Sequence, residues 1–176
     1  MPVILQFKAV RPDAGPDSAG KFYCRKHDKI KDATVKILYL CTGNSCRSQM
    51  AEGWTKHLKG DLIEAFSAGV DPHEVDLRAI EVMAEKGVDI SGYKSKHIDS
   101  FAGIKFDYVI TLCENAQEIC PFFPARVKQA HFAFDDPPRL ASAERVEEEA
   151  LKHYRRVRDE IRSFVEKLPD VLTGGT

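Results

Sequence analysis

The residues with the clearest chemistry are Cys41 and Arg47, the two ends of the heptapeptide CTGNSCR. An apolar run at 35–40 precedes this heptapeptide and a stretch with helical periodicity, 48–58, follows it. In a loop between a strand and a helix, consecutive backbone N–H groups and the positive helix end point at one position, where a tetrahedral oxyanion can bind. The pattern therefore predicts an oxyanion site formed by Thr42, Gly43, Asn44, Ser45, Cys46 and the forked cation of Arg47.

Cys41 is the predicted nucleophile of this loop. A thiol at the base of such a site is expected to have a lowered pKa and to attack the central atom of the bound anion. Ser48, the next residue after Arg47, is a candidate hydrogen-bond donor to the thiolate. The alternative is a cysteine that only packs at the end of a strand. Cys46 is interpreted as a buried packing residue rather than a second nucleophile.

Cys113 and Cys120 form a second candidate pair. Cys120 follows Cys113 by seven positions, and if this segment were helical the two Cα atoms would lie about 10 Å apart. A disulfide requires Cα atoms within roughly 7 Å, so pairing requires the segment to unwind. Such a change would be a redox-linked conformational switch. Two unpaired core thiols are the alternative.

Two aspartates, Asp135 and Asp136, follow another apolar stretch at 127–132. In a parallel sheet they would lie at the same edge as the Cys41 loop, since functional loops gather at the carboxyl ends of the strands. Asp136, restrained by Pro137, is the candidate general acid for a departing oxygen. Asp135 is expected to cap or hydrogen-bond nearby backbone.

The elements that must position these residues alternate along the chain. Strands are predicted over 35–40, 62–66, 106–112 and 127–132, and helices over 48–58, 71–85 and 146–168. Asp71 is the predicted N-cap of the middle helix. This alternation is typical of an α/β fold, here a four-stranded parallel sheet with helices on both faces, over residues 34–176. Residues 1–33 are interpreted as an N-terminal extension, with Cys24 and His27 favouring a surface thiol over a zinc site.

Composition excludes several classes of function. With 26 Lys and Arg against 27 Asp and Glu, the formal charge is -1, so a nucleic-acid-binding protein is not expected. No apolar run is long enough for a membrane span and no signal peptide is recognisable, which favours a cytoplasmic protein without a membrane partner. Five is an odd number of cysteines and excludes a complete disulfide framework.

Several of these segments carry a family resemblance, which covers about residues 35–168. Taken together they resemble the thioredoxin-coupled arsenate reductases, which share the low-molecular-weight tyrosine phosphatase fold. Gln49 stands where the phosphatases usually carry proline. The matching segments are CTGNSCRSQMAEGW at 41–54, SAG at 67–69, GVDIS at 87–91, VITLC at 109–113 with Cys120-Pro121, and FDDP at 134–137.

The resemblance implies a relay of three cysteines. Cys41 would attack arsenate, with Asp136 protonating the departing oxygen, and Cys113 would then attack Cys41 and release arsenite. Cys120 would move the disulfide to Cys113–Cys120, where thioredoxin would reduce it. No bound cofactor is implied. Phosphate and sulfate have the same shape as arsenate and would compete for the loop.

One departure from the family concerns a cation. Some members bind potassium beside the loop through an Asn, a Glu, a Ser and an Asp. Here Asn44, Glu52 and Ser67 are present, but Lys96 stands in the place of the Asp. An ammonium group could neutralise Glu52 without a metal, so the hypothesis is that the chain needs no potassium. The alternative is a Lys96 that points to solvent.

Two other functions remain open at this stage. A phosphatase would use Cys41, Arg47 and Asp136 alone to hydrolyse phosphomonoesters through a phosphocysteine. A non-enzymatic thiol sensor would bind an oxyanion and signal through the disulfide switch.

Overall fold

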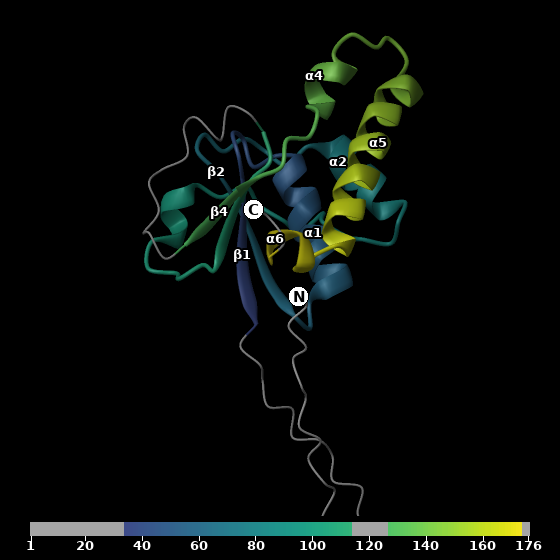
Figure 1. The fold of residues 1–176 in the computed structure, drawn as a ribbon. Helices are drawn as coiled ribbons and strands as arrows, with labels where there is room; N and C mark the ends of the chain where they lie inside the picture. The colour runs from purple at the N-terminus through teal and green to yellow at the C-terminus, as the bar shows by residue number, and fades with distance from the viewer. Residues whose placement is uncertain (1–33, 114–126, 174–176) are drawn as a thin grey trace, which may run out of the picture. The chain divides into compact units, whose positions relative to one another are not determined.

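The computed structural model describes residues 34–113 and 127–173 (Figure 1). Its four strands are β1 (Val35–Cys41), β2 (Ile63–Gly69), β3 (Tyr108–Thr111) and β4 (Lys128–His131). They form one sheet in the order β2-β1-β3-β4, and every pair is parallel. This arrangement confirms the predicted α/β fold. The strand predicted over 106–112 is shorter at both ends than expected, while β1 continues to the candidate nucleophile itself.

The helices are α1 (Arg47–Lys59), α2 (Leu77–Ala84), the 3-10 helix η1 (Ile98–Phe101), α4 (Pro137–Ala141), α5 (Glu147–Glu166) and α6 (Asp170–Thr173). Sequence periodicity predicted α1 and α5 closely. It missed η1, α4 and α6, which are too short to show a period of 3.6 residues. Within the described residues, no helix is long and apolar enough to cross a membrane. The extension predicted over 1–33 and Cys120 both lie outside the described residues.

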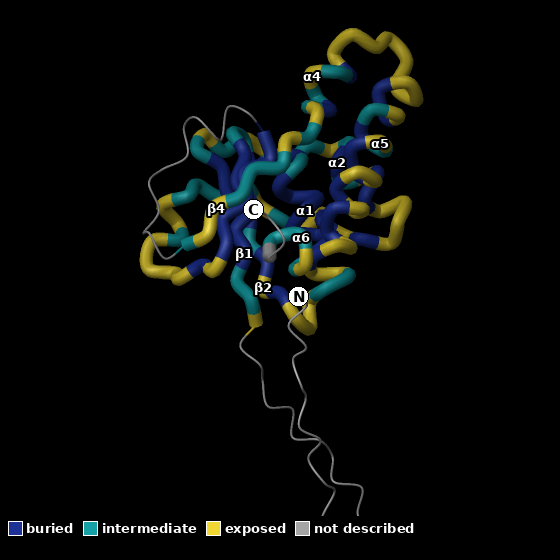
Figure 2. Tube along the Cα trace, in the orientation of Figure 1, coloured by how far each residue is buried: buried dark blue, intermediate teal, exposed yellow. Residues whose placement is uncertain are grey.

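Alternating side chains of β1 face two separate apolar clusters, and Figure 2 shows this strand largely in the dark blue of buried residues. Ile37 and Tyr39 belong to the larger cluster, which α1, α2 and α5 cover. Leu38 and Leu40 face the smaller cluster, which residues of η1 cover. Because both faces are apolar, β1 is the central strand and its carboxyl end opens at the middle of the sheet edge.

The helix predicted over 71–85 is wrong at its start. Asp76, not Asp71, is the N-cap of α2, and its Oδ1 accepts from the backbone N–H groups of Arg78 at 2.8 Å and Ala79 at 3.3 Å. The capping pattern at Asp71 and Pro72 was misleading because this segment is not helical. The backbone N–H groups of Asp71 and His73 donate to carbonyl groups of the Cys41 loop. The predicted terminator, Gly87, is confirmed in its role by a positive φ of 74°.

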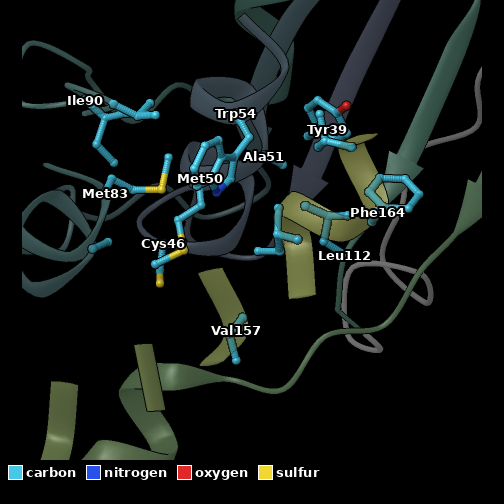
Figure 3. Packing of buried hydrophobic residues seen from close by; sticks show 14 of the residues in the cluster. Tyr39, Cys46, Met50, Ala51, Trp54, Met83, Ile90, Leu112, Val157 and Phe164 are labelled. Carbon is cyan, nitrogen blue, oxygen red and sulfur yellow. The ribbon is translucent and has the colours of Figure 1, made fainter. Parts of the chain in front are cut away.

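The larger cluster is packed tightly around α1, and Figure 3 shows Cys46, Met50 and Trp54 among its members. Gly53 belongs to the same helix. A Cβ at Gly53 would lie 2.8 Å from Cγ2 of Ile90 and 3.2 Å from Cε of Met83. The absence of a side chain therefore allows α1 to approach the segment that follows α2.

We expect Gly53→Ala to lower the free energy of unfolding by about 1–2 kcal/mol. Overpacking costs about 1–3 kcal/mol, which exceeds the gain of up to about 1 kcal/mol from helix propensity. Urea denaturation monitored by fluorescence measures the change. Gly92→Ala is the matched control, because a Cβ there has no atom within 4 Å. A Gly53→Ala variant as stable as the control would contradict this account of the packing.

Candidate active site

Cys41 lies at the end of β1, where the chain enters the loop that leads to α1. Its side chain is only 3% exposed. The Sγ atom lies 2.8 Å from Oγ of Ser48, and the backbone N–H of Asn44 donates to it at 3.1 Å. The predicted partner Ser48 is thus in contact with the thiol, and the loop closes around the sulfur.

The loop around Cys41 is held in shape by hydrogen bonds that its carbonyl groups accept from a neighbouring segment of the chain. Residues 71–76, which we call the strap, run alongside it. The backbone N–H groups of Asp71, His73 and Asp76 donate to the carbonyls of Thr42, Gly43 and Ser45 at 3.0, 2.9 and 2.9 Å. Because these carbonyls face the strap, the N–H groups of the loop are left to face its interior. Sequence reasoning missed the strap, since a backbone contact of this kind leaves no residue pattern.

Asn44 makes several of the hydrogen bonds that fix the conformation of the loop. It has a φ of 47°, the left-handed region that Asn tolerates better than most residues. Its carbonyl accepts from Nε2 of Gln49 at 2.8 Å and from Oγ of Ser95 at 2.6 Å, and its own Nδ2 donates to Ser48 at 2.9 Å. Gln49, which the sequence singled out only as a departure from the phosphatases, therefore holds the loop directly.

The expectation of a lowered pKa at Cys41 is wrong for this arrangement. Burial raises the pKa of the thiol, and the neighbouring Cys113 acts in the same direction. The hydrogen bonds from Ser48 and the Asn44 N–H oppose this effect without overcoming it. Burial also raises the pKa of Cys46, whose side chain lies in the apolar core as interpreted from the sequence.

The guanidinium of Arg47 is engaged with groups other than the thiol. Nη1 donates to the carbonyl of Phe134 at 3.0 Å, and Nη2 lies 3.2 Å from Oδ1 of Asp136. The candidate general acid is therefore brought to the loop as predicted. Asp135 differs from the expectation, since it pairs with Arg156 of α5 at 2.7 Å rather than capping nearby backbone.

Cys113 follows β3 at the same sheet edge and packs against Cys41, the two thiols forming a buried cluster of their own. Its Sγ lies 3.5 Å from Oγ1 of Thr42. A cavity of about 510 Å³ opens over the loop and includes both candidate catalytic groups and residues the sequence did not indicate, namely His73 and Arg139. It is lined by Thr42, Gly43, Ser45, Arg47, His73, Cys113, Ala133, Phe134, Asp135, Asp136, Pro138 and Arg139.

A second polar cluster lies behind the loop, around the buried carboxylate of Glu52. Oε2 accepts from Oγ of Ser67 at 2.5 Å and from Nζ of Lys96 at 3.3 Å, and Oε1 accepts from Nζ of Lys56 at 2.5 Å. The backbone N–H of Lys96 donates to Oδ1 of Asn44 at 2.8 Å. In residues 34–113 and 127–173, no three His, Cys, Asp or Glu side chains gather in a group that could hold a metal ion.

Comparison with known proteins shows which family the chain belongs to. Residues 36–173 match the family described as low molecular weight phosphotyrosine protein phosphatase. The chain belongs to this family. Within it, the chain is similar to the arsenate reductase of Bacillus subtilis (strain 168), at 50% identity over 127 residues, which are 72% of this chain and 89% of the relative.

Other members of the low molecular weight phosphatase family extend the comparison. The arsenate reductase of Halalkalibacterium halodurans is 49% identical over 125 residues, 71% of this chain and 88% of the relative. A solved structure described as an arsenate reductase in the phosphate binding state is 32% identical, with a TM-score of 0.62, over 77% of this chain and 96% of that chain. The family match over residues 36–173 spans the C-x5-R loop and Asp136.

Removing the hydroxyl of Ser48 should make Cys41 a weaker acid. A hydrogen bond to a charged group contributes about 1.5–3 kcal/mol, so Ser48→Ala should raise the pKa of Cys41 further. Less thiolate is then present at a given pH, and the pH profile of Cys41 alkylation moves to higher pH. Rates of iodoacetamide labelling, read at the Cys41 peptide by mass spectrometry, measure this.

Ser163→Ala is the control for this measurement, because its hydroxyl donates to the carbonyl of Asp159 on the surface of α5. It should leave the labelling profile of Cys41 unchanged. An unchanged profile in Ser48→Ala would show that the contact of 2.8 Å does not stabilise the thiolate.

Proposed function

We propose that this chain is an arsenate reductase that converts arsenate to arsenite through Cys41 and Cys113. The observation that carries the proposal is the contact between Cys41 and Cys113, which form a buried cluster of their own at the oxyanion loop. A phosphatase of this fold needs one nucleophile, since water completes its reaction. A second thiol against the first provides instead the electrons for a reduction, because two thiols become one disulfide. The similarity to curated arsenate reductases supports the same substrate.

The loop supports the first step. Its inward N–H groups and Arg47 bind arsenate, and the Cys41 sulfur forms a bond to arsenic while one arsenate oxygen departs as water with a proton from Asp136. Arg47 must turn from Asp136 and Phe134 to the anion for this step. The new contact places cationic charge beside the sulfur, and this charge lowers the energy of the thiolate that burial otherwise disfavours.

The second step uses Cys113. Its thiolate attacks Sγ of Cys41, a sulfur–sulfur bond forms, and the sulfur–arsenic bond breaks with its electron pair remaining on arsenic. Arsenic is thereby reduced and the two sulfurs are oxidised. The Thr42 hydroxyl at 3.5 Å from Cys113 Sγ can donate to this thiolate. The departing arsenite needs protons, because arsenate is anionic near neutral pH and arsenous acid is uncharged.

Cys120 and thioredoxin complete the proposed cycle. Cys120 lies outside the described residues, so its part depends on the sequence resemblance. It attacks Cys113, frees Cys41 and leaves a Cys113–Cys120 disulfide for thioredoxin to reduce. A cytoplasmic site of action is part of the same proposal, since thioredoxin and arsenate meet there.

A phosphomonoesterase is the second candidate, because the loop, Arg47 and Asp136 also suit transfer of a phosphoryl group to Cys41. The two functions differ in their need for Cys113. A phosphatase retains its turnover when Cys113 is replaced, whereas the reductase cannot release arsenite without it.

The discriminating experiment follows arsenate-dependent NADPH oxidation in the presence of thioredoxin and thioredoxin reductase. We expect turnover by the wild type and a loss of at least about 10³-fold in Cys113→Ser and Cys120→Ser, since each removes a nucleophile. Cys24→Ser is the control and should turn over normally. Normal turnover by both relay variants would refute the relay, and rapid hydrolysis of aryl phosphates without arsenate reduction would favour the phosphatase.

We also propose that Lys96 takes the place of a potassium ion behind the loop. Its ammonium lies 3.3 Å from the Glu52 carboxylate, and Lys56 contacts the other oxygen at 2.5 Å. Two ammonium groups therefore balance the buried charge, and the backbone N–H of Lys96 holds Asn44 in its left-handed conformation. A metal cation would meet electrostatic repulsion there.

Replacing sodium chloride by potassium chloride at equal ionic strength should leave the melting temperature and the rate of arsenate reduction unchanged. Lys96→Met should lower the melting temperature in both salts, because it leaves Glu52 with a single cation. Lys36→Met is the control, since Lys36 pairs with Glu64 at the surface. A marked rise in melting temperature of the wild type on changing to potassium would refute the replacement.

A further inference from the structure

The proposed reaction consumes protons that the residues so far assigned do not supply. Balanced for the dianion, arsenate, two thiols and two protons give arsenous acid, one disulfide and water. The monoanion still requires one proton in addition to those of the thiols. Asp136 delivers a proton to the first departing oxygen, so arsenite formation in the second step needs another donor, or repeated recharging of the first.

His73, which lines the cavity, has a side chain that can act as the second proton donor. An imidazole gains and loses a proton near neutral pH, which the arginines of the lining do not. The carboxylates are already engaged, Asp135 with Arg156 and Asp136 with Arg47. His73 therefore stands as the one lining side chain, among the described residues, that can exchange protons with solvent at neutral pH without breaking an arginine pair.

The position of His73 is fixed by the strap. Its backbone N–H donates to the carbonyl of Gly43 at 2.9 Å, which seats the residue directly on the oxyanion loop. A Cβ at Gly43 would lie 2.9 Å from Cδ2 of His73. Because Cδ2 is bonded to Nε2, this edge of the imidazole lies against the loop at the mouth of the cavity. Gly43 is required here for the close approach of the ring.

The surroundings of His73 allow it to be recharged. Its side chain is 65% exposed, and Nε2 lies 3.6 Å from Oδ2 of Asp71, within reach of a carboxylate that can help to pass on a proton. The other charged or titratable side chains around the two cavities that His73 lines are Arg47, Cys113, Asp135, Asp136, Arg139, Glu74, Tyr93 and Lys94. The ring is thus open to solvent and lines the same cavity as Cys113.

We propose that His73 is the proton-transfer residue of the second step. This inference depends on the proposed arsenate reduction. As Cys113 attacks Cys41 and the electron pair stays on arsenic, the imidazolium gives its proton to an arsenite oxygen. The neutral imidazole then takes a proton from water with the help of Asp71. Product leaves as uncharged arsenous acid, which the cationic loop no longer holds.

The test is arsenite formation in a single turnover of fully reduced protein, measured across the neutral pH range. His73→Gln should slow it by about 10-fold at the acidic end, which is less than the roughly 10²-fold or more typical of a general acid, because water can replace an exposed donor. The deficit should shrink as pH rises, since an imidazole is no longer a proton donor in alkaline solution. Added imidazole buffer should restore the rate of His73→Gln without accelerating the wild type.

Two further variants separate proton transfer from other roles. His73→Lys retains a positive charge but does not exchange protons near neutral pH, so it should remain slow although it binds arsenate normally. His57→Gln, on the exposed face of α1, is the control and should match the wild type. We expect the His73 variants to melt at temperatures close to that of the wild type, because backbone hydrogen bonds hold the strap. Such melting temperatures exclude misfolding as the cause of a slow rate.

Each outcome decides the matter. Wild-type rates and pH dependence in His73→Gln overturn the inference while leaving arsenate reduction intact. A uniform deficit that His73→Lys repairs, or a change in arsenate affinity alone, assigns His73 to anion binding and also overturns it. A wild type that forms no arsenite from arsenate refutes the proposed function itself.

Discussion

The site depends on one constraint, which is that the loop carbonyls must be bonded from outside the loop. When the N–H groups of a loop bind an oxyanion, the carbonyl groups of the same peptides point the other way and need hydrogen-bond donors of their own. The strap provides donors for Thr42, Gly43 and Ser45, and Gln49 and Ser95 provide them for Asn44. The catalytic loop is therefore a backbone structure, and the residues that preserve it lie mostly outside the C-x5-R motif.

The strap is in turn anchored to the last long helix. Asp76 ends the strap, caps α2 with one carboxylate oxygen and accepts from the hydroxyl of Tyr154 on α5 with the other, at 2.7 Å. Arg78 extends the same connection through its two contacts with Glu147 at 2.6 and 2.7 Å. The C-terminal helix thus contributes to the shape of a loop more than 70 positions earlier in the chain.

Sequence reasoning succeeded where chemistry and periodicity coincide. The apolar run into Cys41 and the stripe of α5 predicted elements that the structure contains, and the parallel order placed Asp136 beside Arg47. It failed where the deciding contact belongs to the backbone. Asp71 and Pro72 are residue types that often begin a helix, yet their segment runs alongside the loop and is not helical. The pKa of Cys41 was misjudged because the burial that raises it comes from the packing of distant segments, including Cys113, which no local pattern encodes.

The pairing of Arg47 with Asp136 has a consequence for the order of events. While the guanidinium contacts both this carboxylate and the Phe134 carbonyl, the charges of Arg47 and Asp136 neutralise each other. Arrival of an oxyanion exchanges one carboxylate for a more highly charged partner. The same exchange removes the guanidinium from Asp136, so in the proposed reaction the arriving anion itself makes the proposed acid available.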